Sequence, residues 1–71
     1  MRQLQLKPIL RIKAERLTRG WTQLELAYRA GVPISELSRI ETGRSIPYPR
    51  HATRLAETLG ISEAELVQEA E

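Results

Sequence analysis

The sequence predicts an all-α fold of five short helices in a single domain, residues 1–71. Apolar residues recur at helical spacing from the first segment to the last. Helix-capping residues or glycine stand at most of the breaks between these segments. No segment predicts a strand, and no repeat or linker divides the chain, whose 71 residues suit one domain.

The first predicted helix runs from about Pro8 to Arg19. Proline suits a first helical turn because its missing N–H is not needed there. Gly20 then ends the helix. The face expected to point inward is formed by Leu10, Ala14, Leu17 and Trp21.

The second predicted helix begins with a capping box. The Thr22 hydroxyl is expected to accept from the Glu25 N–H, and the Glu25 carboxylate to accept from the Thr22 N–H. Gly31 ends this helix with a positive φ. The buried edge is expected to comprise Leu26, Ala27 and Ala30.

The third predicted helix covers about residues 33–42, and Gly43 closes it. At 100° per residue, Leu37 and Ile40 face inward and Ile34 lies at the border. The opposite face carries small polar and charged side chains. It is expected to comprise Ser35, Glu36, Ser38, Arg39 and Thr42.

A loop at residues 44–49 precedes a fourth helix, from about Pro49 to Leu59, on which His51 is expected at the surface. A second capping box, Ser62 with Glu65, predicts a last helix over about residues 62–70. The expected inner face of the fourth helix comprises Ala52, Leu55, Ala56 and Leu59.

Charge is divided unevenly along the chain. Residues 1–54 hold all eleven Lys and Arg and four Glu, a net charge of +7, whereas residues 55–71 hold five Glu and no base. This division indicates a polyanion on one side of the molecule, or a solvated surface with uneven charge.

The side chains needed for catalysis or metal binding are scarce. The chain has no Cys, no Asp and one His, so neither a catalytic triad nor a four-ligand metal set can be assembled. We therefore expect no enzyme and no cofactor. No apolar run approaches the roughly 20 residues that span a bilayer, so we expect a cytoplasmic protein without membrane contact.

A set of spaced residues occurs together without a gap over roughly residues 9–67. It comprises Arg16-x-x-x-Gly20-Trp21-Thr22-Gln23, Leu26-Ala27, Ala30-Gly31-Val32, Leu37-Ser38-Arg39-Ile40-Glu41-x-Gly43, Pro47 and Leu55-Ala56-x-x-Leu59-Gly60-Ile61. In this combination the chain resembles the phage-repressor (Cro/repressor, XRE-like) helix-turn-helix family. The resemblance implies a repressor-like DNA-binding domain whose second and third helices form the helix-turn-helix, and a regulator of transcription.

The resemblance implies that the third helix enters the major groove of double-stranded DNA. Ser35 and Arg39 match positions that meet bases or nearby phosphates. The Arg39 guanidinium suits guanine O6 and N7, whereas the alternative is a pairing with Glu36 on the same helix.

Two base-contacting candidates depart from the common family pattern. Ile34 either touches a thymine methyl group or extends the edge of the core. Glu36 either accepts from cytosine N4 or faces solvent without a role.

Backbone contacts are implied for residues that flank the third helix. Gln23 matches a family position that touches the DNA backbone and braces the recognition helix. Arg44 matches a position that commonly meets phosphate, and the start of the fourth helix can assist. The full set of candidate backbone contacts is Gln23, Ser38, Thr42, Arg44, Tyr48 and Arg50.

Arg16 and Glu41 are expected to have a structural role. In the family, an Arg near the end of the first helix pairs with a Glu at the end of the recognition helix. Both lie near predicted inner faces here. Such a pair would fix the angle of the recognition helix.

One such domain reads only a few base pairs, so a two-fold homodimer on half-sites about 34 Å apart is expected. No effector domain is expected. The rival hypothesis is an adaptor that keeps this fold and docks another protein through the same polar face. The dimer surface is expected on the last helix and its approach, at Ile61, Leu66, Val67 and Ala70.

Overall fold

The computed structural model describes residues 8–70, so residues 1–7 and Glu71 of the predicted domain lie outside it. Within this range the all-α prediction is confirmed, and no strand is formed. None of these helices is long and apolar enough to cross a membrane. The helices are α1 (Arg11–Thr18), α2 (Gln23–Ala30), α3 (Ile34–Glu41), α4 (Pro49–Leu59) and α5 (Glu63–Leu66).

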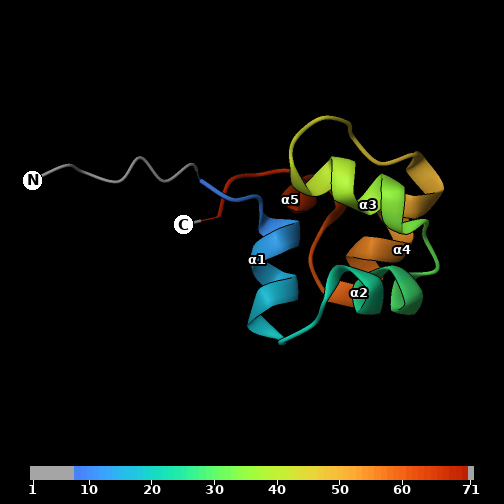
Figure 1. Ribbon diagram of the computed structural model, residues 1–71. Helices are drawn as coiled ribbons and strands as arrows, with labels where there is room; N and C mark the ends of the chain where they lie inside the picture. The colour runs from blue at the N-terminus through green and yellow to red at the C-terminus, as the bar shows by residue number, and fades with distance from the viewer. Residues whose placement is uncertain (1–7, 71) are drawn as a thin grey trace, which may run out of the picture.

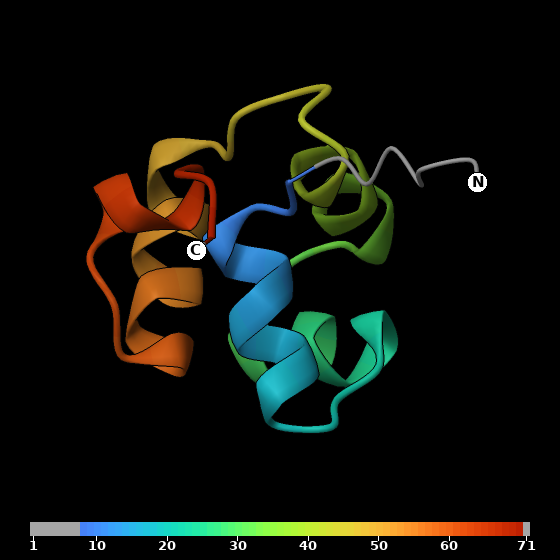
Figure 2. The same ribbon diagram turned by 90° about the vertical axis from the view of Figure 1, so that its left-hand side faces the viewer.

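The helices surround one aliphatic core. α2 packs against both α3 and α4, and α1 packs against α4 and α5. Figure 2 shows α4 and α5 on one side of α1, with α2 and α3 on the other, and Figure 1 shows α3 in front of the core. The side chains with less than 2% exposure are Ile12, Leu26, Leu37, Ile40, Leu55, Leu59 and Leu66.

The first helix begins later than predicted, at Arg11. The preceding residues are extended because they pair with the end of the chain. The Arg11 N–H donates to the Gln68 carbonyl at 2.7 Å, and the Ala70 N–H donates to the Ile9 carbonyl at 2.7 Å. The predicted inner face is also wrong in part. Ile12 and Arg16 are buried, whereas Leu17 is 50% exposed.

The last helix is shorter than predicted. α5 has four residues, and the chain after Leu66 turns to form the bridge with the residues before α1. Leu66 has 0% exposure and belongs to the core of its own chain. The prediction that Leu66 contributes to a dimer surface is therefore wrong. Val67 is exposed, and Ile61 and Ala70 are half-buried.

One predicted cap is complete and the other is partial. Ser62 and Glu65 form the full capping box at α5. The Thr22 hydroxyl accepts from the Glu25 N–H at 3.1 Å. The Glu25 carboxylate accepts instead from Arg29 Nε at 2.6 Å, one helical turn further on. The reciprocal half of the first box is thus replaced by an ion pair.

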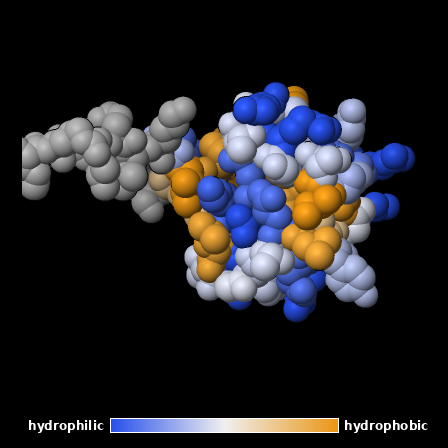
Figure 3. Space-filling model, viewed as in Figure 1, coloured by the Kyte–Doolittle hydropathy of each residue, from blue (hydrophilic) through white to orange (hydrophobic). Residues whose placement is uncertain are grey.

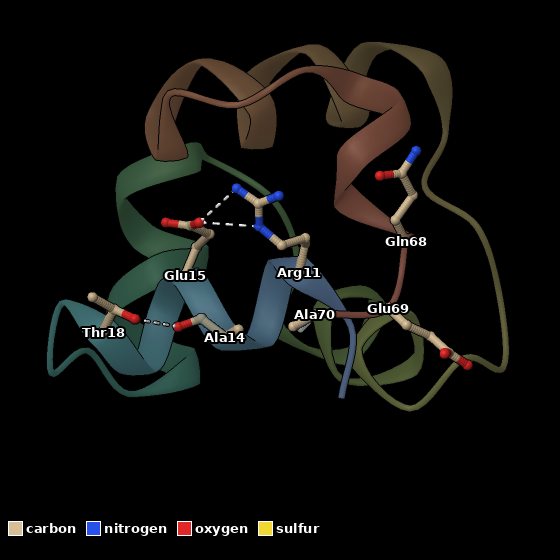
Figure 4. Close-up of a pocket in the computed structure, with 7 residues that line it drawn as sticks. All are labelled: Arg11, Ala14, Glu15, Thr18, Gln68, Glu69 and Ala70. Atoms are coloured by element: carbon tan, nitrogen blue, oxygen red, sulfur yellow. Dashed lines mark hydrogen bonds and ion pairs between the residues drawn. The ribbon is translucent and has the colours of Figure 1, made fainter. Parts of the chain in front are cut away.

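A chain of ion pairs joins α1 to α5. Arg11 contacts Glu15 at 3.0 Å and Glu65 at 3.3 Å, and Arg19 contacts Glu15 at 2.8 Å. Hydrogen bonds from Arg19 and Arg11 lower the pKa of the Glu15 carboxyl. Figure 4 shows the Arg11–Glu15 contact beside the groove between α1 and residues 68–70.

Candidate nucleic-acid interface

The turn between α2 and α3 fixes how α3 is presented. Gly31 has φ +71°, a conformation that L side chains rarely adopt. It allows the Val32 N–H to donate to the Ala27 carbonyl at 3.0 Å, which ends α2 and redirects the chain. Val32 is buried after the turn. The two helices are therefore joined by a short, anchored connection.

A buried ion pair holds the other end of α3. Arg16 Nε donates to Glu41 Oε2 at 2.7 Å, and Arg16 Nη2 donates to Glu41 Oε1 at 2.9 Å. Arg16 Nη1 also donates to the Trp21 carbonyl at 2.8 Å. Gln23 Nε2 donates to Glu41 Oε1 at 3.0 Å. One carboxylate thus connects α1, the start of α2 and the end of α3.

The outward face of α3 carries fewer residues than the helical wheel predicts. Ser35, Arg39 and Thr42 are exposed, Ile34 is 44% exposed and Ser38 is half-buried. Figure 3 shows that hydrophobic surface on this side of the molecule is split into separate patches by a hydrophilic strip. The exposed face of α3 is mainly polar.

Glu36 does not belong to this face. Its residue exposure is 4%, and its Oε1 lies 2.7 Å from His51 Nδ1. The Tyr48 backbone N–H donates to Glu36 Oε2 at 3.3 Å. The predictions that Glu36 contacts bases and that His51 lies at the surface are therefore wrong. The wheel considers one helix alone, and it omits the start of α4, which covers Glu36.

Arginines differ in their partners according to their place in the chain. Among residues 8–70, those before α3 each contact a glutamate, and those from α3 onward form no ion pair. The paired set is Arg11, Arg16, Arg19 and Arg29. The set without a carboxylate partner is Arg39, Arg44, Arg50 and Arg54. Unneutralised positive charge therefore gathers on α3, the following loop and α4.

The loop after α3 keeps Arg44 close to the helix end. Gly43 has φ +77°. Its N–H donates to the Ile40 carbonyl at 3.0 Å, and the Arg44 N–H donates to the Arg39 carbonyl at 2.9 Å. This pattern is a Schellman motif, which closes the last turn of a helix. Further along the loop, Tyr48 is 64% exposed.

Two candidate contacts use part of their hydrogen-bonding capacity inside the protein. The Thr42 hydroxyl donates to the Ser38 and Arg39 carbonyls, each at 3.1 Å. Gln23 uses one amide proton for Glu41 and retains the second. Gln23 is therefore held in one orientation while it keeps a free donor.

Comparison with known proteins agrees with this geometry. A family model described as helix-turn-helix matches residues 12–66. The chain belongs to the helix-turn-helix family. The N-terminal DNA-binding domain of SinR from Bacillus subtilis shares 34% sequence identity, with a TM-score of 0.74 over 86% of this chain and 90% of that one.

A second similar structure is that of a hypothetical transcription factor, NHTF, from Neisseria. It shares 26% identity, with a TM-score of 0.69 over 82% of this chain and 65% of that chain. The comparison with curated proteins found no match. The family is one of regulators and not of enzymes, as the sequence indicates. In residues 8–70, no cluster of His, Cys, Asp and Glu is arranged to hold a metal ion.

The structure adds a residue to this helix-turn-helix surface that sequence reasoning missed. Lys13 of α1 lines the same hollow as Thr42 and Arg44. It forms no ion pair with any residue in the described range. Lys13 comes close to Thr42 and Arg44 because of the way α1 passes the end of α3. The position of Lys13 in the sequence does not reveal that arrangement. The predicted Arg16–Glu41 ion pair could have indicated this proximity, because it joins α1 to the end of α3.

Proposed function

We propose that this helix-turn-helix protein binds double-stranded DNA sequence-specifically and regulates transcription, with α3 in the major groove. The observation that carries the proposal is the set of unpaired arginines around α3. They lie beside an exposed polar helix held rigidly at both ends. In Figure 2 the acidic α5 lies across α1 from α3, packed against α4.

Arg39 is the residue that we assign to base recognition. Its side chain is exposed, and its rival partner Glu36 is already bound by His51 and the Tyr48 N–H. A guanidinium can donate to guanine O6 and N7 together, which discriminates by about 1–3 kcal/mol. Ser35 supports this contact from the first turn of α3. The exposed fraction of Ile34 suits contact with a thymine methyl group.

Phosphate contacts would set the register of α3 in the groove. Arg44 stands at the end of α3, and Lys13 lies across the same hollow. Gln23 offers its second amide proton from the start of α2. Ser38 and Thr42 contribute when their hydroxyl protons turn outward. The remaining proposed backbone contacts are Tyr48 and Arg50.

We further propose that two copies bind a palindromic site with two-fold symmetry, at half-sites about 34 Å apart. Burial of Leu66 leaves a small apolar surface at the end of the chain, mainly Val67. That surface favours a pair that forms on DNA over a stable dimer in free solution. Because its target is DNA, we place the protein in the cytoplasm.

The proposal is tested by selecting ligands for the purified protein from a random duplex pool at low salt. We expect a palindromic sequence to be enriched. Its affinity should fall steeply with salt, by about 0.9 in log K per log unit of salt for each phosphate neutralised. Absence of enrichment and of DNA retention at low salt would refute DNA binding and favour the protein-interaction adaptor.

A further inference from the structure

A buried side-chain pair connects the recognition helix to α4 and takes no part in the contacts proposed above. The Glu36 and His51 side chains are 5% and 10% exposed, and Glu36 Oε1 lies 2.7 Å from His51 Nδ1. A carboxylate accepts hydrogen bonds, so the imidazole N–H is the donor. Because both groups are desolvated, each depends on the other for its hydrogen bond.

The pair joins α3 to the first turn of α4, and both helices also contribute side chains to the aliphatic core. α3 packs closely on α2 and makes few close backbone approaches to α4. The second Glu36 oxygen accepts from the Tyr48 N–H at the start of α4. The Tyr48 ring meets His51 edge-on, with centroids 5.9 Å apart at 73°. One carboxylate thus fixes two points of the α4 start relative to α3.

Those two points lie beside residues of both proposed kinds of DNA contact, the base contact on α3 and the phosphate contacts at the start of α4. Glu36 and Arg39 line one hollow together with Tyr48. Tyr48 immediately precedes α4, and Arg50 lies in its first turn. A shift of the α4 start against α3 would therefore move proposed phosphate contacts relative to the proposed base contact.

We propose that Glu36 and His51 form a positioning pair, which sets the register between the base-reading face of α3 and the phosphate-binding start of α4. A carboxylate close to DNA phosphates is electrostatically unfavourable, so its placement here needs a compensating role. The hydrogen bonds that Glu36 accepts from His51 and from the Tyr48 N–H supply that role, because they join α3 to the start of α4. The inference rests on the proposed DNA-binding function.

The test compares two substitutions that remove the same charge. Glu36→Gln keeps an amide oxygen for the Tyr48 N–H and an NH₂ group that can donate to neutral His51 Nδ1. Glu36→Met has a similar length and offers neither hydrogen bond. Affinities are measured for the selected operator and for random duplex across a salt series. The affinities are measured at a temperature at which circular dichroism shows that each variant is folded.

We expect Glu36→Met to lower the ratio of operator to random affinity by about tenfold, the contribution of one well-placed contact. The salt slope should also fall by about one unit as a phosphate contact is lost. Glu36→Gln should retain both the ratio and the slope. A role confined to folding would lower the unfolding midpoint of Glu36→Met and leave both binding quantities unchanged.

An equal effect of the two substitutions would overturn the positioning role, because charge alone would then account for the result. Should Glu36→Met fail to fold, His51→Asn against His51→Leu makes the same comparison. Asn retains a donor near the Nδ1 position, whereas Leu does not. If the wild-type protein binds no duplex, the proposed function fails and this inference with it. If the wild-type protein binds and all variants keep its ratio, only this inference fails.

Discussion

The Arg16→Met substitution tests whether the buried ion pair holds the recognition helix. The variant loses two hydrogen bonds to Glu41, at 2.7 and 2.9 Å, and one to the Trp21 carbonyl at 2.8 Å. The Glu41 side chain is 1% exposed, so its charge would remain buried with only the Gln23 amide as a partner. Removing one member of such a pair destabilises by about 3–5 kcal/mol.

This loss is large for a domain of 71 residues. At about 4–8 °C per kcal/mol, the unfolding midpoint should fall by roughly 12–40 °C. The free energy of unfolding is measured by urea denaturation followed by far-ultraviolet circular dichroism. The matched control is Arg16→Met combined with Glu41→Leu, which removes both charges. It should recover most of the stability, because an apolar pair of similar volume needs no partner.

The single and double variants together decide the role of the pair. A loss below about 1 kcal/mol for Arg16→Met would mean that the contact contributes no more than an exposed salt bridge. Equal destabilisation of the single and double variants would show that lost packing, and not the unpaired carboxylate, is responsible. Either result would refute the reasoning from burial.

Three further predictions concern the interface and the surface charges. Arg39→Ala should weaken operator binding by about 1–3 kcal/mol more than random-duplex binding in a fluorescence titration, and equal losses would remove Arg39 from base recognition. Arg44→Ala should weaken both alike and reduce the salt slope by about one unit, whereas an unchanged slope would argue against a phosphate contact. Arg19 and Arg11 lower the pKa of Glu15 in the folded protein, so its stabilising effect is complete above the usual value of 4.5 and is lost as the pH falls through the folded value. The free energy of unfolding should therefore decrease less steeply below about pH 4.5 in Glu15→Gln than in the wild type, and identical pH profiles would contradict this effect.

Features set by local sequence were predictable. Gly31 and Gly43 mark where α2 and α3 end, because each adopts a positive φ that closes the preceding helix. The apolar spacing placed Leu37 and Ile40 in the core, where both have 0% exposure. The ion pair of Arg16 and Glu41 was expected from the family resemblance, and the structure contains it.

Features set by contacts between distant segments were not predictable from spacing. The pairing of residues 9–11 with residues 68–70 delays α1 and shortens α5. Burial of Glu36 requires the loop after α3 to bring His51 over it. Lys13 lines the same hollow as Thr42 and Arg44 only because α1 passes the end of α3. A helical wheel describes one helix alone, so it cannot predict contacts between segments that are far apart in the sequence.

The proposed interface is tested most directly by titrating isotope-labelled protein with the selected duplex and following backbone amide signals by nuclear magnetic resonance. The largest shifts are expected at the outward face of α3 and at residues 43–50, with smaller shifts at the start of α2. Signals from α5 and residues 67–70 should change little. Shifts confined to that acidic end, or none with any duplex at low salt, would contradict the proposal that α3 docks on DNA.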